Sequence, residues 1–369
     1  MNEHPVTRRR FISQLSAAAA ALTLLPRPLR AAPAGPGRRL GIVLVGLGNY
    51  SENHLAPAIR ESKYWKLAGV VTGDAAKGRR WAREHGFPAT NIWHYDTMNR
   101  IAGHPEVEVV YVVTPNGLHA AHAIAAARAG KHVICEKPMA NTVEECDAII
   151  AACDKARVEL FLGYRLHYEP HHVAFAEIGR SQEFGPFQRM KGANGFRMGD
   201  GHGWRLNAKL AGGGPLMDMG VYVIQAACMA KAEAAPVAIT AKFGPVERPE
   251  IFKEVEESVS WTAEFADGST AECLATYAKN VSYLRAEAAR GWAQVDSFYY
   301  EGQRLTTSAG ERKYPPVNHQ LVQMDGIAGS LLEGKPNIVP GSMGRRDLTI
   351  VEAIYASARA GGQRVAVRA

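Results

Sequence analysis

Three ionisable residues in two separate motifs are the first candidates for chemistry in this 369-residue sequence. Lys137 lies in CEKPMA (residues 135–140), directly after an apolar run, and would bring a cation to the end of a strand. Asp218 and Tyr222 lie in GGGPLMDMGVY (residues 212–222), four residues apart and therefore on one face of a helix. A polar pair on an otherwise apolar helix needs a reason, because burying unpaired polar groups is costly. A surface lysine and a core tyrosine bonded to a structural aspartate are the simpler alternatives.

A glycine-rich turn precedes these motifs in GIVLVGLGNYS, residues 41–51, directly after an apolar run and before a plausible helix. Gly46 would allow the tight bend, and Gly48 would let backbone amides approach a pyrophosphate at the helix N-terminus. Ser51 stands where the dinucleotide fingerprint usually has a third glycine. A purely structural turn is the alternative, but the position at the first of several alternating strands favours a dinucleotide.

The next apolar run ends in VVTGDAAKGRR, residues 70–80, where a ribose would be recognised. An NAD enzyme usually has Asp or Glu where Thr72 and Gly73 stand. A hydroxyl with Lys77 and further arginines nearby suits the 2′-phosphate of NADP, because cations and short donors complement a dianion. Asp74 would argue for NAD if its side chain turned inward. The sequence therefore favours NADP, with NAD possible.

The elements that must position these residues follow two patterns. From residue 40 to about 163, runs dense in Val, Ile and Leu alternate with helical stretches, which predicts a parallel sheet with helices on both faces. From residue 237 to about 300 the alternation has a period near two, which suits half-buried antiparallel strands. We therefore expect an α/β Rossmann domain followed by an α+β domain with a mostly antiparallel open sheet. The expected strands are GIVLVG, KLAGVV, VEVVYVV, KHVIC, VELFLG, SVSWTAEF, STAECLATY and WAQVDSFYY, and the expected helices are 55–62, 75–85, 119–129, 143–156, 171–179, 320–332 and 343–360.

These patterns divide the chain into four parts. Residues 1–34 are expected to be a signal peptide, and residues 38–162 a dinucleotide-binding domain. Residues 163–345 would form a domain for substrate binding and oligomerisation, because an antiparallel sheet offers a broad face for pairing into a dimer or tetramer. A C-terminal helix at 346–362 would pack back on the first domain.

The N-terminus resembles a twin-arginine signal: Arg8 and Arg9 precede Phe11, an apolar run at 17–25 and small residues at 32–34. A basic tail or an uncleaved anchor is the alternative. Because the twin-arginine route carries folded proteins, often with cofactor installed, we expect a periplasmic or exported protein that leaves with its nucleotide aboard. No later segment approaches roughly 18 uninterrupted apolar residues, so no stable membrane association is expected after the signal is removed.

Composition and residue spacing argue against nucleic-acid binding, paired cysteines and a metal site. The formal charge of +7 falls to +3 once the five arginines and one glutamate of residues 1–34 are set aside, which is too mild to suggest nucleic acid. The five cysteines form no CxxC pair and are expected to be buried thiols. His119 and His122, like His171 and His172, lack a Cys or carboxylate partner at ligand spacing, so no metal site is expected.

Together these motifs resemble the Gfo/Idh/MocA family of sugar oxidoreductases, and within it the glucose–fructose oxidoreductases, over about residues 40–359. The EKP element marks the broad family, whereas Asp-x-x-x-Tyr is more discriminating, because many relatives have His where Tyr222 stands. The segments that carry the resemblance are GLGNY (46–50), PNGLHA (115–120), AGKHVICEKPMA (129–140), GYRLHYEPH (163–171), WRLNAKLAGGGPLMDMGVY (204–222), EVEESVSW (254–261) and AIYASARAG (353–361).

The resemblance implies a role for each residue of the first two motifs. Tyr222 would exchange the proton of a sugar hydroxyl while hydride passes between that carbon and the nicotinamide. Lys137 would lie beside both, and Asp218 would position the sugar. A phenol, with a reference pKa of about 10, needs help to act as a base near neutral pH, and a nearby ammonium provides it by favouring the phenolate.

The resemblance also implies two sets of binding residues. The residues expected to bind the cofactor are Gly46, Gly48, Asn49, Tyr50, Thr72, Gly73, Lys77, Thr114, Pro115, Asn116, His119, Glu136, Lys137, Arg165, Trp204 and Arg205. The residues expected to bind the sugar are Lys137, Arg165, His167, Tyr168, Asp218 and Tyr222.

Export together with a nucleotide site favours a particular reaction. Outside the cytoplasm there is no supply of NADPH, so a tightly held NADP would be reduced by one sugar and reoxidised by another, turning an aldose into a lactone. One departure from the exported relatives is the short stretch between Ala34 and Leu40, where they can carry a longer arm over the cofactor. The alternatives are a sugar dehydrogenase or reductase with exchangeable NAD(P), a glycoside-modifying relative using transient oxidation, and a non-catalytic sugar-binding protein.

Overall fold

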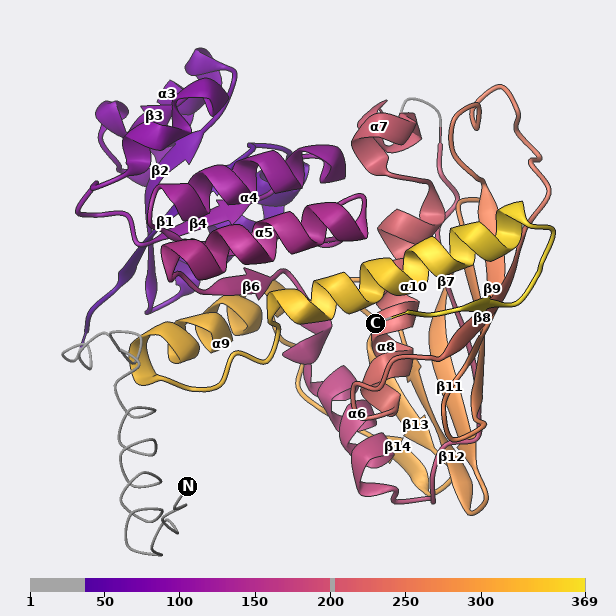
Figure 1. Cartoon of the computed structure of the whole chain (residues 1–369). Coiled ribbons are helices and arrows are strands. Elements are labelled where there is room, and N and C mark those ends of the chain that lie inside the picture. Colours follow the sequence, from indigo (N-terminus) through magenta and orange to yellow (C-terminus); the bar gives the residue numbers. More distant parts are fainter. Residues whose placement is uncertain (1–36, 200–202, 369) are drawn as a thin grey trace, which may run out of the picture.

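A six-stranded parallel sheet begins the computed structural model, which describes residues 37–199 and 203–368 (Figure 1). The expected twin-arginine signal, residues 1–34, lies outside the described residues. Five of the six strands were predicted. The sixth, β3, has only two residues and is too short to appear as an apolar run in the sequence. The strands are β1 Leu40–Val45, β2 Trp65–Val71, β3 Ile92–Trp93, β4 Val109–Val112, β5 His132–Cys135 and β6 Leu160–Leu162.

The strand order β3-β2-β1-β4-β5-β6 reverses direction between β1 and β4. Right-handed crossovers therefore put the helices that follow β1 and β2 on one face of the sheet and those that follow β4 and β5 on the other. A crevice opens at this reversal, outside the carboxyl ends of the strands. The helices are α2 Ala56–Glu61, α3 Ala75–His85, α4 His119–Arg128 and α5 Val143–Ala156, and α4 and α5 lie side by side in Figure 1.

A nine-stranded sheet forms most of the second half of the chain, in the order β14-β13-β12-β11-β7-β10-β9-β8-β15. Every neighbouring pair is antiparallel except β7 and β10, which run parallel. The expectation of a mostly antiparallel open sheet is confirmed. The strands are β7 Arg189–Gly195, β8 Ala238–Phe243, β9 Ser258–Glu264, β10 Thr270–Thr276, β11 Val281–Ala288, β12 Gly291–Asp296, β13 Arg304–Thr307, β14 Gly310–Arg312 and β15 Val365–Ala366.

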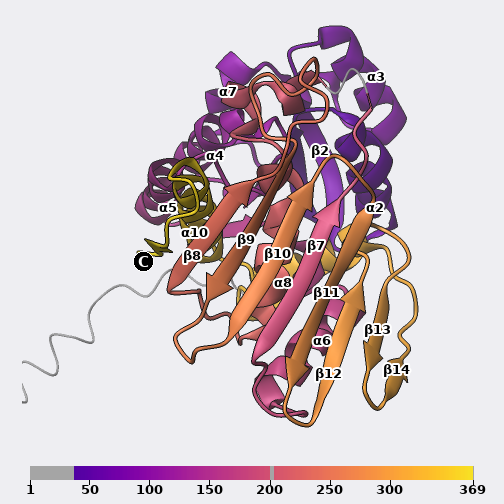
Figure 2. The same cartoon turned by 90° about the vertical axis from the view of Figure 1, so that its right-hand side faces the viewer.

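Two helices cover one face of this sheet. The helix α8, Val221–Ala230, is buried along its whole length and contacts β7 and β11, and α6, Pro170–Ser181, contacts α8 and β12. Figure 2 looks onto the opposite face, with α6 and α8 behind the strands. The alternation of buried and exposed residues along β9 and β10 follows from this one-sided burial.

Two C-terminal helices join the halves of the molecule. The helix α9, His319–Glu333, packs on α2. The helix α10, Gly341–Arg359, contacts α5 in the first half and β8 in the second (Figure 1). The C-terminal helix therefore begins at Gly341, before the expected boundary at 346, and it packs on both halves rather than on the first alone.

One predicted strand ends early, and the correction matters for the site. The alternation of WAQVDSFYY suggested a strand continuing to Tyr300, but β12 ends at Asp296. Ser297 has a φ of +64°, a left-handed conformation that a continuous strand cannot contain. The chain leaves the sheet there, and the next residues, Phe298 to Tyr300, reach the cavity described below.

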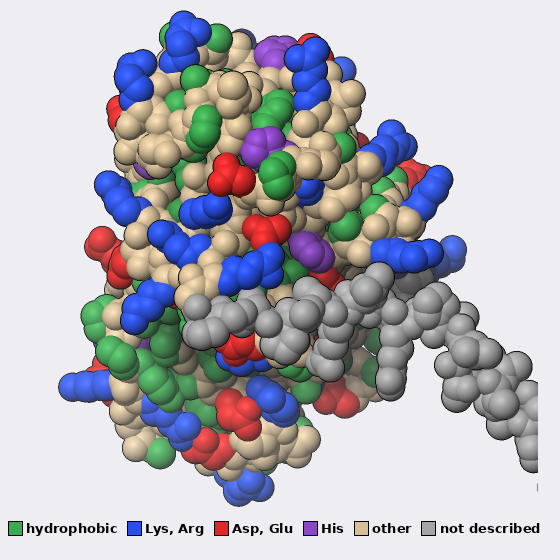
Figure 3. Space-filling view, turned by 90° about the vertical axis from the view of Figure 1, so that its left-hand side faces the viewer, with side chains coloured by type: hydrophobic (Ala, Val, Ile, Leu, Met, Phe, Trp, Pro, Cys, Tyr) green, Lys and Arg blue, Asp and Glu red, His purple; other side chains and the backbone are tan. Residues whose placement is uncertain are grey.

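The cysteines, the helices and the surface charges are all arranged as in an ordinary globular protein. All five cysteines are buried and unpaired, as expected. Among the described residues, no helix is both long and apolar enough to cross a bilayer. On the face drawn in Figure 3, basic and acidic side chains are scattered among each other over both halves of the molecule.

Candidate active site

A cavity of about 960 Å³ lies at the carboxyl ends of the parallel strands, between the two sheets. The four central strands of the first sheet each deliver a residue to the cavity at the carboxyl end, because parallel strands all finish at the same edge. Gly46 follows β1, Thr72 follows β2, Thr114 follows β4 and Glu136 follows β5. The second half of the chain closes the opposite wall.

The glycine turn after β1 has the shape that a dinucleotide needs. Gly46 has a φ of +95°, and a Cβ there would lie 3.0 Å from the backbone oxygen of Val113, so only glycine fits. A Cβ on Gly48 would meet nothing within 4 Å, which leaves open space where a pyrophosphate would approach. Ser51 donates a hydrogen bond of 2.6 Å from Oγ to the carbonyl of Gly46 and so closes the turn in place of a third glycine.

The residues after β2 fit a phosphorylated ribose. The carboxylate of Asp74 caps α3, accepting hydrogen bonds from the backbone amides of Ala76 at 2.9 Å and Lys77 at 3.0 Å. These two bonds, that from Lys77 foremost, lower the pKa of Asp74. Lys77 also reaches back from α3 to donate to the carbonyl of Leu47 at 3.1 Å, which holds its ammonium at the cavity wall. Thr72 lines the same wall, and a hydroxyl beside an ammonium complements a phosphate.

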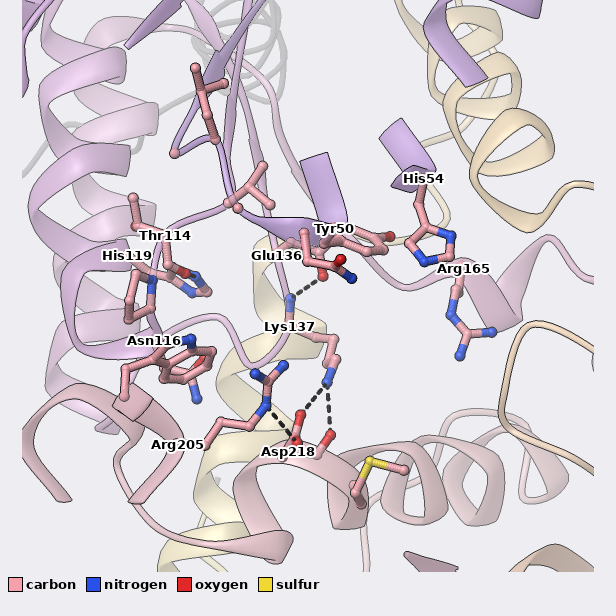
Figure 4. Close-up of a pocket in the computed structure, with 18 of the residues that line it drawn as sticks. Tyr50, His54, Thr114, Asn116, His119, Glu136, Lys137, Arg165, Arg205 and Asp218 are labelled. Atoms are coloured by element: carbon pink, nitrogen blue, oxygen red, sulfur yellow. Dashed lines mark hydrogen bonds and ion pairs between the residues drawn. The ribbon is translucent and has the colours of Figure 1, made fainter. Parts of the chain in front are cut away.

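Lys137 and Asp218 meet across the cavity. The ammonium of Lys137 donates to the backbone carbonyl of Asp218 at 2.7 Å and to its Oδ1 at 3.3 Å (Figure 4). Although burial disfavours its charge, the neighbouring Tyr222, Asp218 and Glu136 raise the pKa of Lys137. Burial likewise opposes the charge of Asp218, but Lys137 and Arg205 lower its pKa. Both groups are therefore charged at neutral pH.

The second oxygen of Asp218 has two further partners. Arg205 approaches Oδ2 with Nε at 3.1 Å, from the other side of the carboxylate in Figure 4. The hydroxyl of Tyr277, at the end of β10, donates to the same oxygen at 2.9 Å. Tyr277 is buried in a small apolar cluster and was missed by the sequence analysis, because a tyrosine at a strand end has no motif of its own. Three side chains from separate elements thus fix the carboxylate.

Asp218 lies on a π-helical turn and Tyr222 on the α-helix that follows it, so the two do not share one regular α-helix as their spacing suggested. The π-helix η8, Leu216–Gly220, runs directly into α8, and the amide of Val221 donates to the carbonyl of Leu216. Glu256 holds the entry to this turn by accepting from the amides of Gly214 at 2.9 Å and Leu216 at 3.2 Å. Single π-turns often occur at functional sites, where they displace side chains from the α-helical positions.

Two cations lie against the ring of Tyr222. Nζ of Lys137 is 4.6 Å from the ring centroid, and Cζ of Arg165 is 4.9 Å from it. Tyr222 itself is only 7% exposed. The ammonium of Lys137 therefore contacts both the phenol ring and the carboxylate of the second motif, and all three residues line the same cavity as the glycine turn.

An aromatic wall, Tyr50, His54 and Tyr300, closes one side of the cavity. The ring of Tyr300 stacks on that of His54, with centroids 4.3 Å apart, and lies 6.4 Å from that of Tyr50. His54 belongs to the π-helix η2, Ser51–Leu55, which continues the glycine turn, whereas Tyr300 comes from the loop after β12. The stack therefore joins the two halves of the molecule.

A buried carboxyl group lies beside Lys137. Glu136 accepts a hydrogen bond of 2.6 Å from the hydroxyl of Tyr111, which in turn accepts one of 3.0 Å from Gln323 of α9. Burial raises the pKa of Glu136. This chain of hydrogen bonds links the base of the cavity to α9.

Asn116 and His119 line the cavity, but their side chains bond to its framework. Asn116 donates from Nδ2 to the carbonyl of Ala211 at 2.8 Å. The two ring nitrogens of His119 lie 2.9 Å from the carbonyl oxygen of Pro138 and 2.7 Å from that of Thr114. Burial lowers the pKa of His119 to about 4. Both residues therefore tie together the loops that surround the site.

The structure brings all but two of the expected site residues to this one cavity. The two exceptions are His167 and Tyr168, which the resemblance placed beside the sugar. The 3₁₀ turn η6, Arg165–His167, directs Arg165 into the cavity and His167 away from it, toward Glu233 at 3.2 Å. Tyr168 packs on α9, where a Cβ on Gly326 would lie 2.2 Å from its ring. The expected residues that line the cavity are Gly46, Gly48, Asn49, Tyr50, Thr72, Gly73, Lys77, Thr114, Pro115, Asn116, His119, Glu136, Lys137, Arg165, Trp204, Arg205, Asp218 and Tyr222.

Several lining residues were not expected. They are mostly aromatic and lie in loops or short turns, which neither periodicity nor a motif distinguishes from ordinary core or surface positions. They are His54, Tyr95, Phe196, Met219, Phe298, Tyr299 and Tyr300.

The described part of the chain contains no group of three or more His, Cys, Asp or Glu residues placed to hold a metal ion. The cations of this site are the side chains of lysine and arginine, and the residues present fit a dinucleotide with a small polar substrate beside it.

Two family models match the chain. One, described as an oxidoreductase family with an NAD-binding Rossmann fold, GFO_IDH_MocA, matches residues 40–164. The other, the GFO/IDH/MocA C-terminal domain, matches residues 172–293. The two models together account for both halves of the fold.

Individual proteins with similar sequences are enzymes of sugar chemistry. The NADP(+) D-xylose 1-dehydrogenase of Haloarcula marismortui is 24% identical over 327 residues, or 85% of this chain and 89% of that protein. The 1,5-anhydro-D-fructose reductase of Ensifer adhaerens is 30% identical over 185 residues, which is about half of each chain. The crystal structure of aldose-aldose oxidoreductase from Caulobacter crescentus, complexed with glycerol, has a TM-score of 0.85 and 38% identity, and the match covers 89% of this chain and all of that one.

Proposed function

Because this chain belongs to the Gfo/Idh/MocA oxidoreductase family, we propose that it is an NADP-dependent oxidoreductase that interconverts a sugar hydroxyl and a carbonyl. The observation that carries the proposal is the contact of Lys137 with Asp218 and Tyr222 in the same cavity as the glycine turn. When bound, the nicotinamide would supply the acceptor or donor of hydride.

The cofactor would be held by the wall that the first sheet provides. Gly46 and Gly48 leave room for the pyrophosphate, and Thr72 and Lys77 would hold the 2′-phosphate of NADP. Asp74 does not compete for the ribose, because its carboxylate caps α3. These contacts support NADP over NAD.

The sugar would be handled by the second wall. Tyr222, as phenolate, would accept the proton of the hydroxyl as the carbonyl forms, and it would return that proton in the reverse direction. Lys137 stabilises the phenolate and the developing charge on the sugar oxygen. Asp218, held by Lys137, Arg205 and Tyr277, would accept a hydrogen bond from a neighbouring sugar hydroxyl and fix its orientation.

We propose further that the reaction couples two sugars, in the manner of a glucose–fructose oxidoreductase. One aldose would be oxidised to a lactone, and a second sugar would be reduced in the same site. The 38% identity to an aldose-aldose oxidoreductase over 89% of the chain supports this coupling. So does the aromatic wall, because Tyr300 and His54 join the two halves of the molecule beside the cofactor site and would slow nucleotide release.

The test is the absorbance of the purified protein in the reduced-nicotinamide band. After extensive dialysis, D-glucose or D-xylose is added, and then a second aldose or a ketose. Reduction by the first sugar and reoxidation by the second, without added nucleotide, supports the coupled reaction. A requirement for added NADP⁺ at every turnover identifies a dehydrogenase with exchangeable cofactor instead. Tyr222→Phe should abolish either signal, and full activity in that variant would contradict the proposed base.

We propose that the protein is exported by the twin-arginine route, because Arg8 and Arg9 precede an apolar run in residues 1–34. Fractionation of a bacterial host that expresses the full chain tests this. Wild type should appear in the periplasm in a shortened form, and replacing both arginines with lysine should retain the longer form in the cytoplasm. Equal distributions of the two proteins would contradict export.

We propose a homo-oligomer paired through the open face of the nine-stranded sheet, which Figure 2 displays with the helices behind it. Light scattering on a sizing column measures the mass directly. A dimer or tetramer supports the proposal, whereas the mass of a single chain at micromolar concentration contradicts it.

A further inference from the structure

Four side chains stack in a row across the site. The guanidinium of Arg165 lies between two tyrosine rings, with Cζ 4.9 Å from the centroid of Tyr222 and 4.6 Å from that of Tyr300. On its far side, Tyr300 stacks on His54 at 4.3 Å. Arg165 thus places a cation against the face of Tyr222, in addition to the ammonium of Lys137.

Both outer nitrogens of Arg165 donate hydrogen bonds to groups of the protein. NH1 bonds to Nδ1 of His319 at 2.8 Å and to the carbonyl of Tyr299 at 3.2 Å, and NH2 bonds to the carbonyl of Phe298. Arg165 is only 3% exposed. The sequence analysis expected Arg165 to bind cofactor and sugar, but a guanidinium whose outer nitrogens are all engaged in this way is better suited to hold neighbouring groups in place.

His319 is the one side chain among these partners, and it must be neutral to accept from Arg165. It is the first residue of α9, where the helix dipole disfavours an imidazolium. Burial, and next the charge of Arg165, lower its pKa to about 4. The other titratable groups around it are Glu169, the N-cap residue of α6, and His171 and His172 of that helix.

We propose that His319 is a positioning residue that holds Arg165 in the stack, so that two cations rather than one face the phenol of Tyr222. The inference rests on the proposed function, in which Tyr222 is the base. The groups that surround Tyr222 are Lys137, Arg165 and Asp218 together with the phenols of Tyr50 and Tyr300.

The consequence concerns the rate of proton exchange at Tyr222. A cation close to a phenol stabilises negative charge that develops on its oxygen, and it loses that effect if it can rotate away. Without the acceptor of His319, the NH1 group loses its 2.8 Å bond and keeps the carbonyl of Tyr299, and the guanidinium gains freedom to leave the stack. The kcat of sugar oxidation should then fall about 3- to 10-fold.

The chain offers a matched set of variants. His319→Leu removes the acceptor at similar volume, and His319→Asn restores an acceptor, since its amide oxygen can take the place of Nδ1. His171→Asn is the control, because His171 lies in the same buried cluster but bonds to Glu169 at 2.7 Å and not to Arg165. Circular dichroism on heating establishes that each variant is folded.

The measurement is the steady-state rate of D-xylose-dependent NADP⁺ reduction by the purified protein, which gives kcat and KM separately. The expected result is a kcat lowered about 3- to 10-fold in His319→Leu, restored in His319→Asn and unchanged in His171→Asn. The KM values for D-xylose and NADP⁺ should stay close to those of wild type, because His319 acts on Arg165 and not on the ligands.

An unchanged kcat in folded His319→Leu would overturn the proposal. So would an equal loss of kcat in His171→Asn, because that would indicate a general effect of disturbing the buried cluster. The proposed function fails separately: if Tyr222→Phe alone retains D-xylose-dependent reduction of NADP⁺, Tyr222 is not the base, whatever the His319 variants show.

Discussion

The carboxylate of Asp218 is held by Lys137, Arg205 and Tyr277, and the three come from different parts of the chain. Lys137 and Arg205 belong to segments that the sequence analysis singled out, whereas Tyr277 belongs to none. At the scale of single residues, the site therefore depends as much on the partners of its ionisable groups as on those groups themselves. Arg165 likewise depends on a partner, His319, which accepts a hydrogen bond from its guanidinium.

Replacing Tyr277 with phenylalanine tests this dependence. The variant loses the 2.9 Å hydrogen bond to Oδ2 but keeps the packing of the ring. Since a hydrogen bond to a charged group contributes about 1.5–3 kcal/mol, kcat/KM for the sugar should fall at least tenfold. Steady-state kinetics with D-xylose and NADP⁺ measures kcat/KM. The control is Tyr283→Phe on β11. Equal loss in both variants would contradict a specific role.

The depressed pKa of His319 predicts a pH-dependent stability. Because its pKa falls from 6.5 to about 4 on folding, the unfolded chain binds a proton more readily between these values. This contribution to the free energy of unfolding is complete above pH 6.5 and is lost as the pH falls toward 4, by up to about 3 kcal/mol.

Urea unfolding of wild type and His319→Asn at pH 7 and pH 4.5 measures the difference. The wild type should lose more stability than the variant over this interval, because asparagine does not titrate. Parallel losses in the two proteins would show that His319 does not bind its proton on unfolding.

At the scale of elements, two π-helical turns shape the site. The turn η2 follows the glycines and carries His54, and the turn η8 carries Asp218 and leads into Tyr222. Each begins at a point where the backbone is held from outside the helix: Ser51 bonds to Gly46, and Glu256 bonds to the amides of Gly214 and Leu216. Side-chain contacts thus determine where these helices start.

Glu256→Gln is expected to disturb the second of these turns. The carboxylate accepts from two backbone amides and from the hydroxyl of Tyr355 at 2.9 Å, and an amide offers only one acceptor atom. Leaving buried donors unpaired costs about 1–3 kcal/mol, so the unfolding temperature should fall and kcat with it. The control is Glu254→Gln, whose carboxylate caps α7, Ala208–Ala211, in a more exposed position. A larger effect at Glu254 would contradict the argument.

At the scale of the whole molecule, the cavity lies between two halves that α10 and the stack of Tyr300 on His54 hold together. A ligand that contacts both walls stabilises the folded chain as a unit. A nucleotide at 100 times its Kd would add about 2.7 kcal/mol to the free energy of unfolding. Binding and thermal stability should therefore be linked.

The variant Gly48→Ala should separate nucleotide binding from the thermal stability of the ligand-free protein. A Cβ at this position meets nothing within 4 Å in the protein, so the variant should unfold at the same temperature as wild type without ligand. The added methyl group would occupy the approach of the pyrophosphate, and the upward shift that NADP⁺ gives wild type should be lost. Scanning calorimetry with and without NADP⁺ measures both quantities. An undiminished shift in the variant would place the nucleotide elsewhere.

Periodicity and glycine placement were enough to predict most of the architecture. Buried parallel strands produce continuous apolar runs and one-sided antiparallel strands produce alternation, so the parallel sheet, strands β9, β10 and β12 of the antiparallel sheet and most helices could be recognised locally. The prediction failed where local pattern and backbone disagreed. The run that ends at Tyr300 alternates as a strand should, but the left-handed Ser297 turns the chain out of the sheet.

The sequence by itself determined which residues end each parallel strand, and hence that Gly46, Thr72 and Lys137 share one crevice, because parallel strands finish at a common edge. Only the tertiary structure decided which side chains meet there from distant segments. Tyr277, His319 and Tyr300 have no motif, since their importance comes from contacts with Asp218, Arg165 and His54 across the fold. His167 and Tyr168 shared a motif with Arg165, yet one 3₁₀ turn directs them away from the cavity. Contacts between segments far apart in sequence depend on how the sheets and helices pack, and one-dimensional spacing does not contain that information.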